Sequence, residues 1–126
     1  MAVEKVTAKT WEQKVINSKK PVVVNFSAAY CGFCMMLDPL YSKLSDQYEG
    51  NLSFLKLMVD EPQNQELLEK ISIDGTPTLK FYCQGREVGE HIGYAIEPVI
   101  KKKIDAMLDE MDTCISNSTP LSNQEK

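Results

Sequence analysis

The sequence lacks several features that would assign it to common functional classes. No stretch approaches the ~20 consecutive apolar residues of a membrane-spanning helix, and the first residues lack the apolar segment of a secretory signal. The net charge of −4 is mild, and the fourteen lysines and arginines are scattered along the chain. We therefore expect no nucleic-acid or membrane partner, and we expect a cytoplasmic protein.

What is present fits one globular domain. With 126 residues, 43% of them hydrophobic and 25% charged, the chain can bury a core that needs no disulfide staples. No internal repeat and no second domain are visible. From about Asp112 the sequence turns to Ser, Asn, Thr and Pro. We therefore expect one domain over residues 1–111 and a disordered tail over residues 112–126.

Apolar periodicity predicts alternating strands and helices. Val22–Ser27 is almost entirely apolar, as expected of a strand that is covered on both faces. The expected strands are residues 3–6, 22–27, 52–59, 78–83 and 87–92, the last two joined as a hairpin. The expected helices are residues 11–17 with Thr10 as N-cap, a helix from the cysteine pair to about Gly50, residues 64–70, and residues 97–111. This order predicts an α/β fold with a central mixed β-sheet flanked by helices.

Two cysteines stand between the expected strand 22–27 and the helix that follows it. Cys31 and Cys34 enclose Gly32 and Phe33. This position places the first sulfur at a helix N-terminus, where unpaired amides and the helix dipole stabilise an anion. Because a thiolate is the nucleophile in disulfide exchange, a reactive cysteine can arise here. The second thiol lies one helical turn away.

Zinc binding is the alternative use of this pair. A structural zinc site needs four ligands, and the remaining candidates, Cys83, Cys114 and His91, are isolated in the sequence. We therefore favour redox chemistry and expect no metal. We expect Cys83 and Cys114 to be incidental thiols, and His91 to be structural or solvated.

From about Thr10 to Leu108 the chain resembles the thioredoxin family. The resemblance rests on the segment Val22–Cys34, on Leu37–Pro39, on Lys56–Asp60, and on Gly75–Thr78 with Phe81 and Gly85. A lone CxxC would be weak evidence, but its place between a buried strand and a helix, followed by Thr-Pro-Thr and a glycine hairpin, is specific. The resemblance implies a single thioredoxin-like domain and thiol–disulfide oxidoreductase activity without a bound cofactor.

The resemblance also assigns roles to single residues. Cys31 would be the exposed attacking thiol, and Cys34 the more buried resolving thiol. Pro77 matches the proline that follows a cis peptide bond beside the active site in this family. The Thr76 backbone would then face the sulfurs and pair with an extended substrate segment.

Ile92 and Gly93 would form the third wall of the substrate groove. Simple turn geometry is the alternative explanation for Gly93 and for Gly75.

Asn25 departs from the family pattern, because thioredoxins usually carry a buried aspartate at this position. An amide cannot act as a general base, so resolution by Cys34 would depend on water, on Cys31 or on Lys56. Alternatively, Asn25 is only a hydrogen-bonded polar residue in a covered strand.

The residues around the cysteines depart as well. Phe33 replaces the usual proline, and Cys-Gly-aromatic-Cys resembles the motif of some disulfide isomerases. We therefore expect a reduction potential somewhat more oxidising than that of ordinary thioredoxins. Tyr30 stands where a tryptophan is common, and we expect it to pack beside Cys31.

The leading hypothesis is a monomeric oxidoreductase that reduces disulfides of protein substrates in the cytoplasm. By resemblance, a flavin-dependent, NADPH-fed thioredoxin reductase would restore its dithiol. Two alternatives stay open. One is a disulfide oxidase or isomerase of an exported compartment, whose signal peptide has been removed. The other is a thioredoxin-fold interaction module in which the thiols are secondary.

Overall fold

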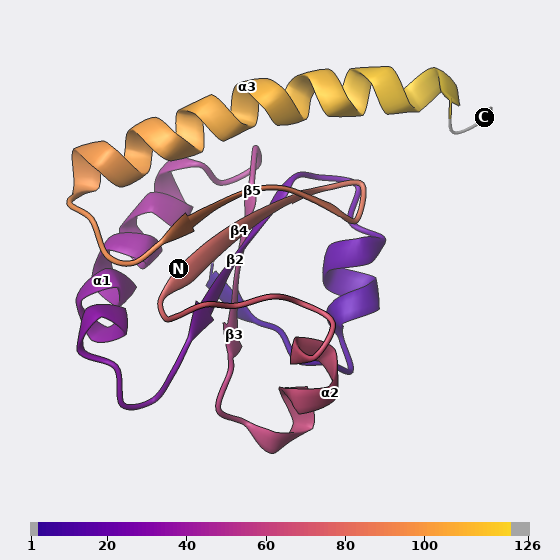
Figure 1. The fold of residues 1–126 in the computed structure, drawn as a ribbon. Coiled ribbons are helices and arrows are strands. Elements are labelled where there is room, and N and C mark those ends of the chain that lie inside the picture. Colours follow the sequence, from indigo (N-terminus) through magenta and orange to yellow (C-terminus); the bar gives the residue numbers. More distant parts are fainter. Residues whose placement is uncertain (1–2, 122–126) are drawn as a thin grey trace.

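The computed structural model describes the backbone of residues 3–121 and the side chains of residues 3–111. Strands and helical segments alternate along the chain before a final hairpin and helix (Figure 1). The elements are β1 (Val3–Lys5), η1 (Glu12–Ile16), β2 (Val22–Ser27), α1 (Gly32–Gln47), β3 (Ser53–Met58), η2 (Pro62–Asn64), α2 (Gln65–Leu68), β4 (Thr78–Cys83), β5 (Arg86–Ile92) and α3 (Glu97–Leu121).

The strands form one five-stranded mixed sheet in the order β1-β3-β2-β4-β5. β1, β3 and β2 run parallel because helical segments connect them, whereas β4 and β5 are antiparallel neighbours. The β4–β5 turn holds Gln84 and Gly85 at φ values of 55° and 79°, as a two-residue hairpin turn requires. The predicted fold class, a mixed sheet flanked by helices, is confirmed.

Each face of the sheet carries its own apolar core. Side chains of β2 alternate between the faces, so Val23 packs beneath α1 and α3 while Val24 and Phe26 pack on the side of η1 and α2 (Figure 1). Every residue of β2 is buried. The central strand is therefore fixed by neighbours on both edges and by cores on both faces.

Two short helical segments differ from their predictions. η1 is π-helical, with the Asn17 amide donating to the Glu12 carbonyl at 2.9 Å. Thr10 is not its N-cap, because the Thr10 hydroxyl accepts from the Thr7 amide at 3.0 Å and so closes the preceding turn. The helix predicted over residues 64–70 is shorter, with α2 covering Gln65–Leu68 after the 3₁₀ turn η2.

α3 is longer than its prediction. Its backbone stays helical to Leu121, although helix was expected only as far as Met111. No glycine and no proline occurs between Asp112 and Thr119, so the local sequence contains no strong helix breaker before Pro120. The expected disorder of residues 122–126 falls outside the described part of the chain. None of the described helices is both long and apolar enough to cross a membrane.

The Tyr41 hydroxyl anchors α1 to the sheet. Its oxygen lies 2.7 Å from the Leu55 carbonyl oxygen in β3 and 3.1 Å from the Val23 carbonyl oxygen in β2. Burial raises the pKa of Tyr41 well above its usual value, so the hydroxyl stays protonated and donates.

Replacing Tyr41 by phenylalanine should lower the free energy of unfolding by about 1–2 kcal/mol, because a buried hydrogen bond is lost. Urea denaturation of the full chain measures this difference. Tyr30→Phe is the matched control, since the Tyr30 side chain is fully exposed, and it should change the free energy by less than about 0.5 kcal/mol. Equal effects of the two substitutions would contradict the anchoring role.

His91 lies half-buried on β5, with its Nε2 atom buried and without a hydrogen-bond partner among the described residues. Burial lowers the pKa of His91, and the cation of Lys103 lowers it further. The folded protein therefore holds the neutral imidazole, whereas the unfolded chain takes up a proton more readily.

Stability that depends on His91 should be complete above the unfolded pKa of about 6.5 and should fall as the pH drops toward the lower folded pKa. Denaturation at several values between about pH 7 and pH 5 tests this sign against a His91→Gln variant, which lacks the titrating group. If both proteins lose the same stability over that range, His91 is not responsible.

Candidate active site

The end of β2 positions the first cysteine. After Ser27 the chain leaves the sheet and reaches Cys31, the N-cap of α1, in an extended conformation with φ −140° and ψ 110°. Asp60, which follows β3, holds this loop because its carboxylate accepts from the Ala29 amide at 2.9 Å. The neighbouring parallel strand therefore fixes where Cys31 stands.

Cys31 and Cys34 are joined by a disulfide, with their Cα atoms 5.2 Å apart. The Cys34 amide donates to the Cys31 sulfur at 3.2 Å, so this sulfur occupies the capping position of the helix. Cys31 is partly exposed, whereas Cys34 is 1% exposed. An incoming thiol can reach the first sulfur, while the second lies against the sheet.

Among the predicted groove residues, Thr76 lies beside the Cys31 sulfur. The Thr76–Pro77 peptide bond is cis. The Thr76 hydroxyl donates to the Cys31 sulfur at 3.4 Å, and the Thr76 carbonyl oxygen lies 3.6 Å from the same sulfur. The Gly93 amide donates to the Pro77 carbonyl at 2.7 Å, and Ile92 beside it is half-exposed. Thr76 therefore borders the Cys31 sulfur, and Pro77 connects Thr76 with the segment of Ile92 and Gly93.

Large apolar side chains are exposed close to the cysteines in sequence and at the end of β5. They are Tyr30, Phe33, Met35, Met36 and Ile92. The expected packing of Tyr30 beside Cys31 is wrong, because its side chain is 101% exposed and projects from the loop. Residues near one sulfur thus present an apolar surface to a partner molecule.

Asn25 lies in β2 beneath α1 and is completely buried. Neither its amide nitrogen nor its amide oxygen has a hydrogen-bond partner within the described part of the chain. The described residues therefore do not supply the hydrogen-bond partner that the alternative for Asn25 expects.

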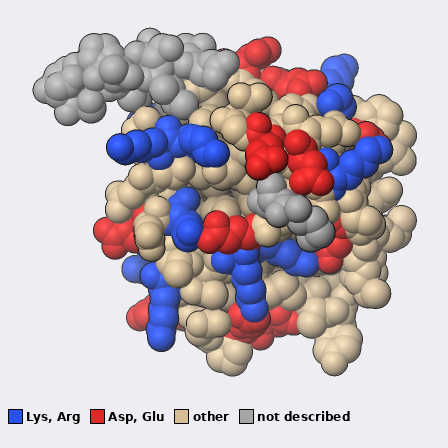
Figure 2. All heavy atoms as spheres, turned by 180° about the vertical axis from the view of Figure 1, so that it is seen from behind, with Lys and Arg blue, Asp and Glu red and all other residues tan. Residues whose placement is uncertain are grey.

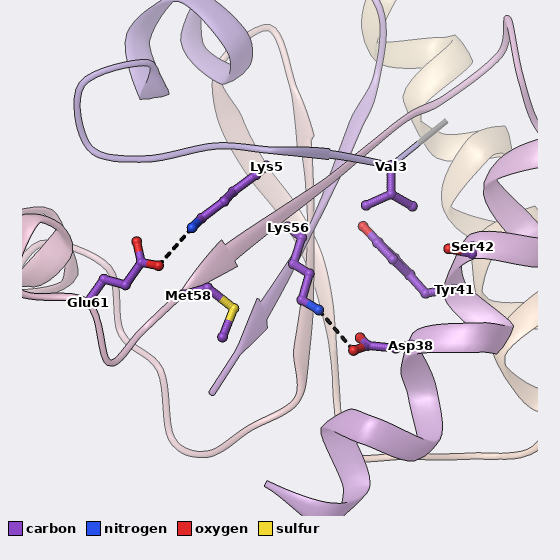
Figure 3. A pocket seen from close by; sticks show the side chains of 8 residues that line it. All are labelled: Val3, Lys5, Asp38, Tyr41, Ser42, Lys56, Met58 and Glu61. Atoms are coloured by element: carbon purple, nitrogen blue, oxygen red, sulfur yellow. Dashed lines mark hydrogen bonds and ion pairs between the residues drawn. The ribbon is translucent and has the colours of Figure 1, made fainter. Parts of the chain in front are cut away.

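Lys56 pairs with Asn25 in the strand register, but its ammonium group is directed elsewhere. It binds the Asp38 carboxylate at 2.9 Å, in a cavity of about 590 Å³ that Val3, Lys5, Tyr41, Ser42, Met58 and Glu61 also line (Figure 3). Lys56 is thus held by α1 at the surface and does not serve as a partner for the Asn25 amide.

Asp60 and Asp38 are the site residues that the sequence reasoning missed. Both stand in segments that resemble the family, Lys56–Asp60 and Leu37–Pro39. For Asp60 the available signal was an acidic residue just after a strand, whereas Asp38 lies within α1. Their roles depend on contacts with Ala29 and Lys56, which their own local sequence does not indicate.

The expectation of an incidental thiol at Cys83 is wrong, because Cys83 is buried and disulfide-bonded. Its sulfur lies 3.8 Å from the Met111 carbonyl oxygen of α3. The side chain of Cys114 falls outside the described residues. Among those that are described, no three His, Cys, Asp or Glu side chains are grouped as metal ligands would be.

Comparison with known proteins agrees with this geometry. The thioredoxin family profile matches residues 2–106. A thioredoxin of Chlorobaculum thiosulfatiphilum is 37% identical over 99 residues, which cover 79% of this chain and 90% of that protein. The thioredoxin of Sus scrofa is 34% identical over 111 residues, 86% of this chain and 98% of its own.

A protein disulfide isomerase-like 2-1 of Oryza sativa is 36% identical over 84 residues, but these are only 23% of its length. Cys31 and Cys34 lie at disulfide distance, and the relatives are thioredoxins. The chain is therefore a dithiol–disulfide oxidoreductase. From the profile match, the length of chain shared with these relatives and the geometry at Cys31, the chain belongs to the thioredoxin family.

Proposed function

We propose that this protein reduces disulfide bonds in other proteins, with Cys31 as nucleophile and Cys34 as resolving thiol. The observation that carries the proposal is the unequal environment of the two sulfurs. The Cys31 sulfur caps α1 and is partly exposed beside Thr76, whereas Cys34 is buried. A substrate therefore meets Cys31 first.

The reaction transfers two electrons from the dithiol to the substrate. The Cys31 thiolate attacks one sulfur of the substrate disulfide, that disulfide breaks, and the first substrate thiolate leaves and takes a proton. Cys34 supplies that proton and, as the thiolate, attacks the Cys31 sulfur. The mixed disulfide breaks, the second substrate thiolate leaves, and the Cys31–Cys34 disulfide closes.

The groove supports an extended polypeptide as substrate. The Thr76 backbone lies beside the reacting sulfur, where an added strand can pair with it. The exposed side chains of Phe33 and Ile92 fit an apolar segment of the substrate. On the face shown in Figure 2, lysines and arginines lie among acidic side chains, so no single charge dominates that face.

Once the Cys31–Cys34 disulfide has closed, its return to the dithiol requires an external electron donor. We assign this role to a flavin-dependent reductase of the thioredoxin reductase type, which the family membership supports. A reductase cycle of this kind belongs in a reducing compartment, and we place the protein in the cytoplasm as a monomer that takes part in electron transport and cell redox homeostasis.

A second candidate is a disulfide oxidase or isomerase of an exported compartment. The disulfide-bonded state of Cys83 favours it, because lasting structural disulfides belong mainly to oxidising compartments. Two further observations favour this candidate. Phe33 is an aromatic residue between the cysteines, and one relative is the protein disulfide isomerase-like 2-1 of Oryza sativa.

A Cys34→Ser variant should accumulate a mixed disulfide between Cys31 and a protein substrate, because no second thiol resolves it. Reduced variant is mixed with insulin, quenched by alkylation and analysed by non-reducing electrophoresis and mass spectrometry. Steady-state insulin reduction with dithiothreitol should fall at least about 100-fold, as for loss of a reacting group. Cys31→Ser is the matched control and should trap nothing.

Trapping by Cys31→Ser rather than by Cys34→Ser would reverse the two roles. Retention of full insulin reduction by a Cys31→Ser/Cys34→Ser double variant would contradict redox catalysis by this pair and favour an interaction module.

A further inference from the structure

We propose that Cys83 and Cys114 form a second disulfide, which fastens the C-terminal part of α3 to β4. The bond is structural and stays closed while the Cys31–Cys34 pair is oxidised and reduced. The proposal goes beyond the proposed function, and it does not depend on the direction of electron flow at Cys31.

The partner of Cys83 follows from the cysteines of the chain. The sequence contains four, and Cys31 is bonded to Cys34. Cys83 is itself disulfide-bonded, and it is only 1% exposed, so a cysteine of another molecule cannot reach it. Cys114 is the cysteine that remains.

The backbone of α3 brings the position of Cys114 to Cys83. The Cys83 sulfur lies 3.8 Å from the Met111 carbonyl oxygen. In an α-helix, the carbonyl of residue 111 is directed toward the amide of residue 115. Because the α3 backbone is helical through Leu121, the Cys83 sulfur stands beside the helical turn of residues 112–115. Cys114 is the cysteine of that turn.

Packing holds α3 against the β4–β5 hairpin near this point. Met107 and Met111 are buried and lie in one apolar cluster with Cys83. A Cβ atom at Gly89 of β5 would collide with the Met107 sulfur, so the glycine allows the helix to approach the strand closely. Figure 1 shows α3 crossing the sheet toward the end that carries the β4–β5 turn. The bond therefore joins two elements that the core already holds together.

The last turns of α3 need an anchor of this kind. The thioredoxin family profile ends at residue 106, whereas α3 continues to Leu121. Residues 112–120 are mainly Asp, Thr, Ser and Asn, which are weak helix formers. Because a short helix of such residues is marginal by itself, tertiary attachment has to stabilise it. A covalent link at Cys114 attaches this segment to the sheet.

Formation of the bond requires a disulfide as oxidant, for which oxidised glutathione suffices. The Cys83 thiolate attacks one glutathione sulfur, and the first glutathione thiolate leaves. The Cys114 thiolate then attacks the Cys83 sulfur, and the second glutathione thiolate leaves. Two electrons pass from the two cysteines to glutathione, and their two protons go to the departing thiolates.

The two disulfides should differ in their reaction with added thiols. Cys31 is partly exposed, whereas Cys83 is buried in the core. An attacking thiolate must reach a sulfur, so dithiothreitol should open the Cys31–Cys34 bond first.

The first test maps the disulfides of the full chain, refolded with oxidised glutathione and digested by trypsin without reductant. Trypsin cleaves after Lys and Arg, so Cys83 lies on peptide 81–86 and Cys114 on peptide 104–126. Mass spectrometry should find these two peptides joined. Either peptide carrying a free thiol, or joined to a copy of itself or to the active-site peptide, overturns the proposal.

The second test follows the order of reduction. With limiting dithiothreitol and alkylation at successive times, Cys31 and Cys34 should be labelled at least about tenfold faster than Cys83 and Cys114. Equal rates would overturn the claim that the second bond stays closed while the first one cycles.

The third test uses a Cys114→Ser variant. Without reductant it should melt about 10 °C below the wild-type protein, because the closed loop no longer restrains the unfolded chain. The control is the same comparison after complete reduction of both proteins, in which the melting temperatures should agree within about 2 °C. Equal melting temperatures without reductant, or the same difference after reduction, overturn the structural role.

Insulin reduction separates this proposal from the proposed function. The Cys114→Ser variant should keep the wild-type rate within about twofold at a temperature where it is folded, because the second bond takes no part in the reaction. A loss of at least tenfold would overturn that separation. A wild-type protein that carries the 81–86 to 104–126 link but does not reduce insulin would instead count against the proposed function alone.

Discussion

The burial of β2 is the constraint from which the active site follows. This strand has hydrogen-bonded neighbours on both edges and apolar cores on both faces, so its C-terminal end at Ser27 is fixed. The chain then crosses to the next layer and begins α1, which packs back onto the sheet through Leu37 and Tyr41. The first turn of α1 must therefore stand over the end of the strand, and Cys31 is the residue at that point.

The same geometry makes the two cysteines chemically unequal. Capping places the Cys31 sulfur near the positive end of the helix dipole, where Thr76 adds a hydrogen bond. One turn later the helix directs Cys34 toward the sheet, where it is shielded from solvent. Access and anion stabilisation coincide at one sulfur, which explains why a single CxxC segment can provide an attacking thiol and an internal resolving thiol.

Local patterns in the sequence were enough to predict the strands, the mixed sheet and the position of the cysteine pair, because burial and helix capping act over neighbouring residues. Two contacts were not predictable in this way, because each joins residues far apart in sequence. They are the ion pair of Lys56 with Asp38 and the hydrogen bond from the Ala29 amide to the Asp60 carboxylate. The packing predicted for Tyr30 failed for a related reason. An aromatic residue suggests burial, but the fold places no surface against this side chain, which is fully exposed. Only the folded structure showed that the Asn25 side chain has no hydrogen-bond partner among the described residues.

The reduction potential of the Cys31–Cys34 couple in the unmodified protein is the most direct test of the reductase assignment. It is measured by equilibration in graded dithiothreitol and glutathione buffers. Thioredoxins lie near about −270 mV and protein disulfide isomerase near about −180 mV. We predict a value between these two and closer to the first, because the chain belongs to the thioredoxin family but carries Phe33 in place of the usual proline between the cysteines. A potential at or above about −180 mV would contradict a reductase and favour an oxidase or isomerase.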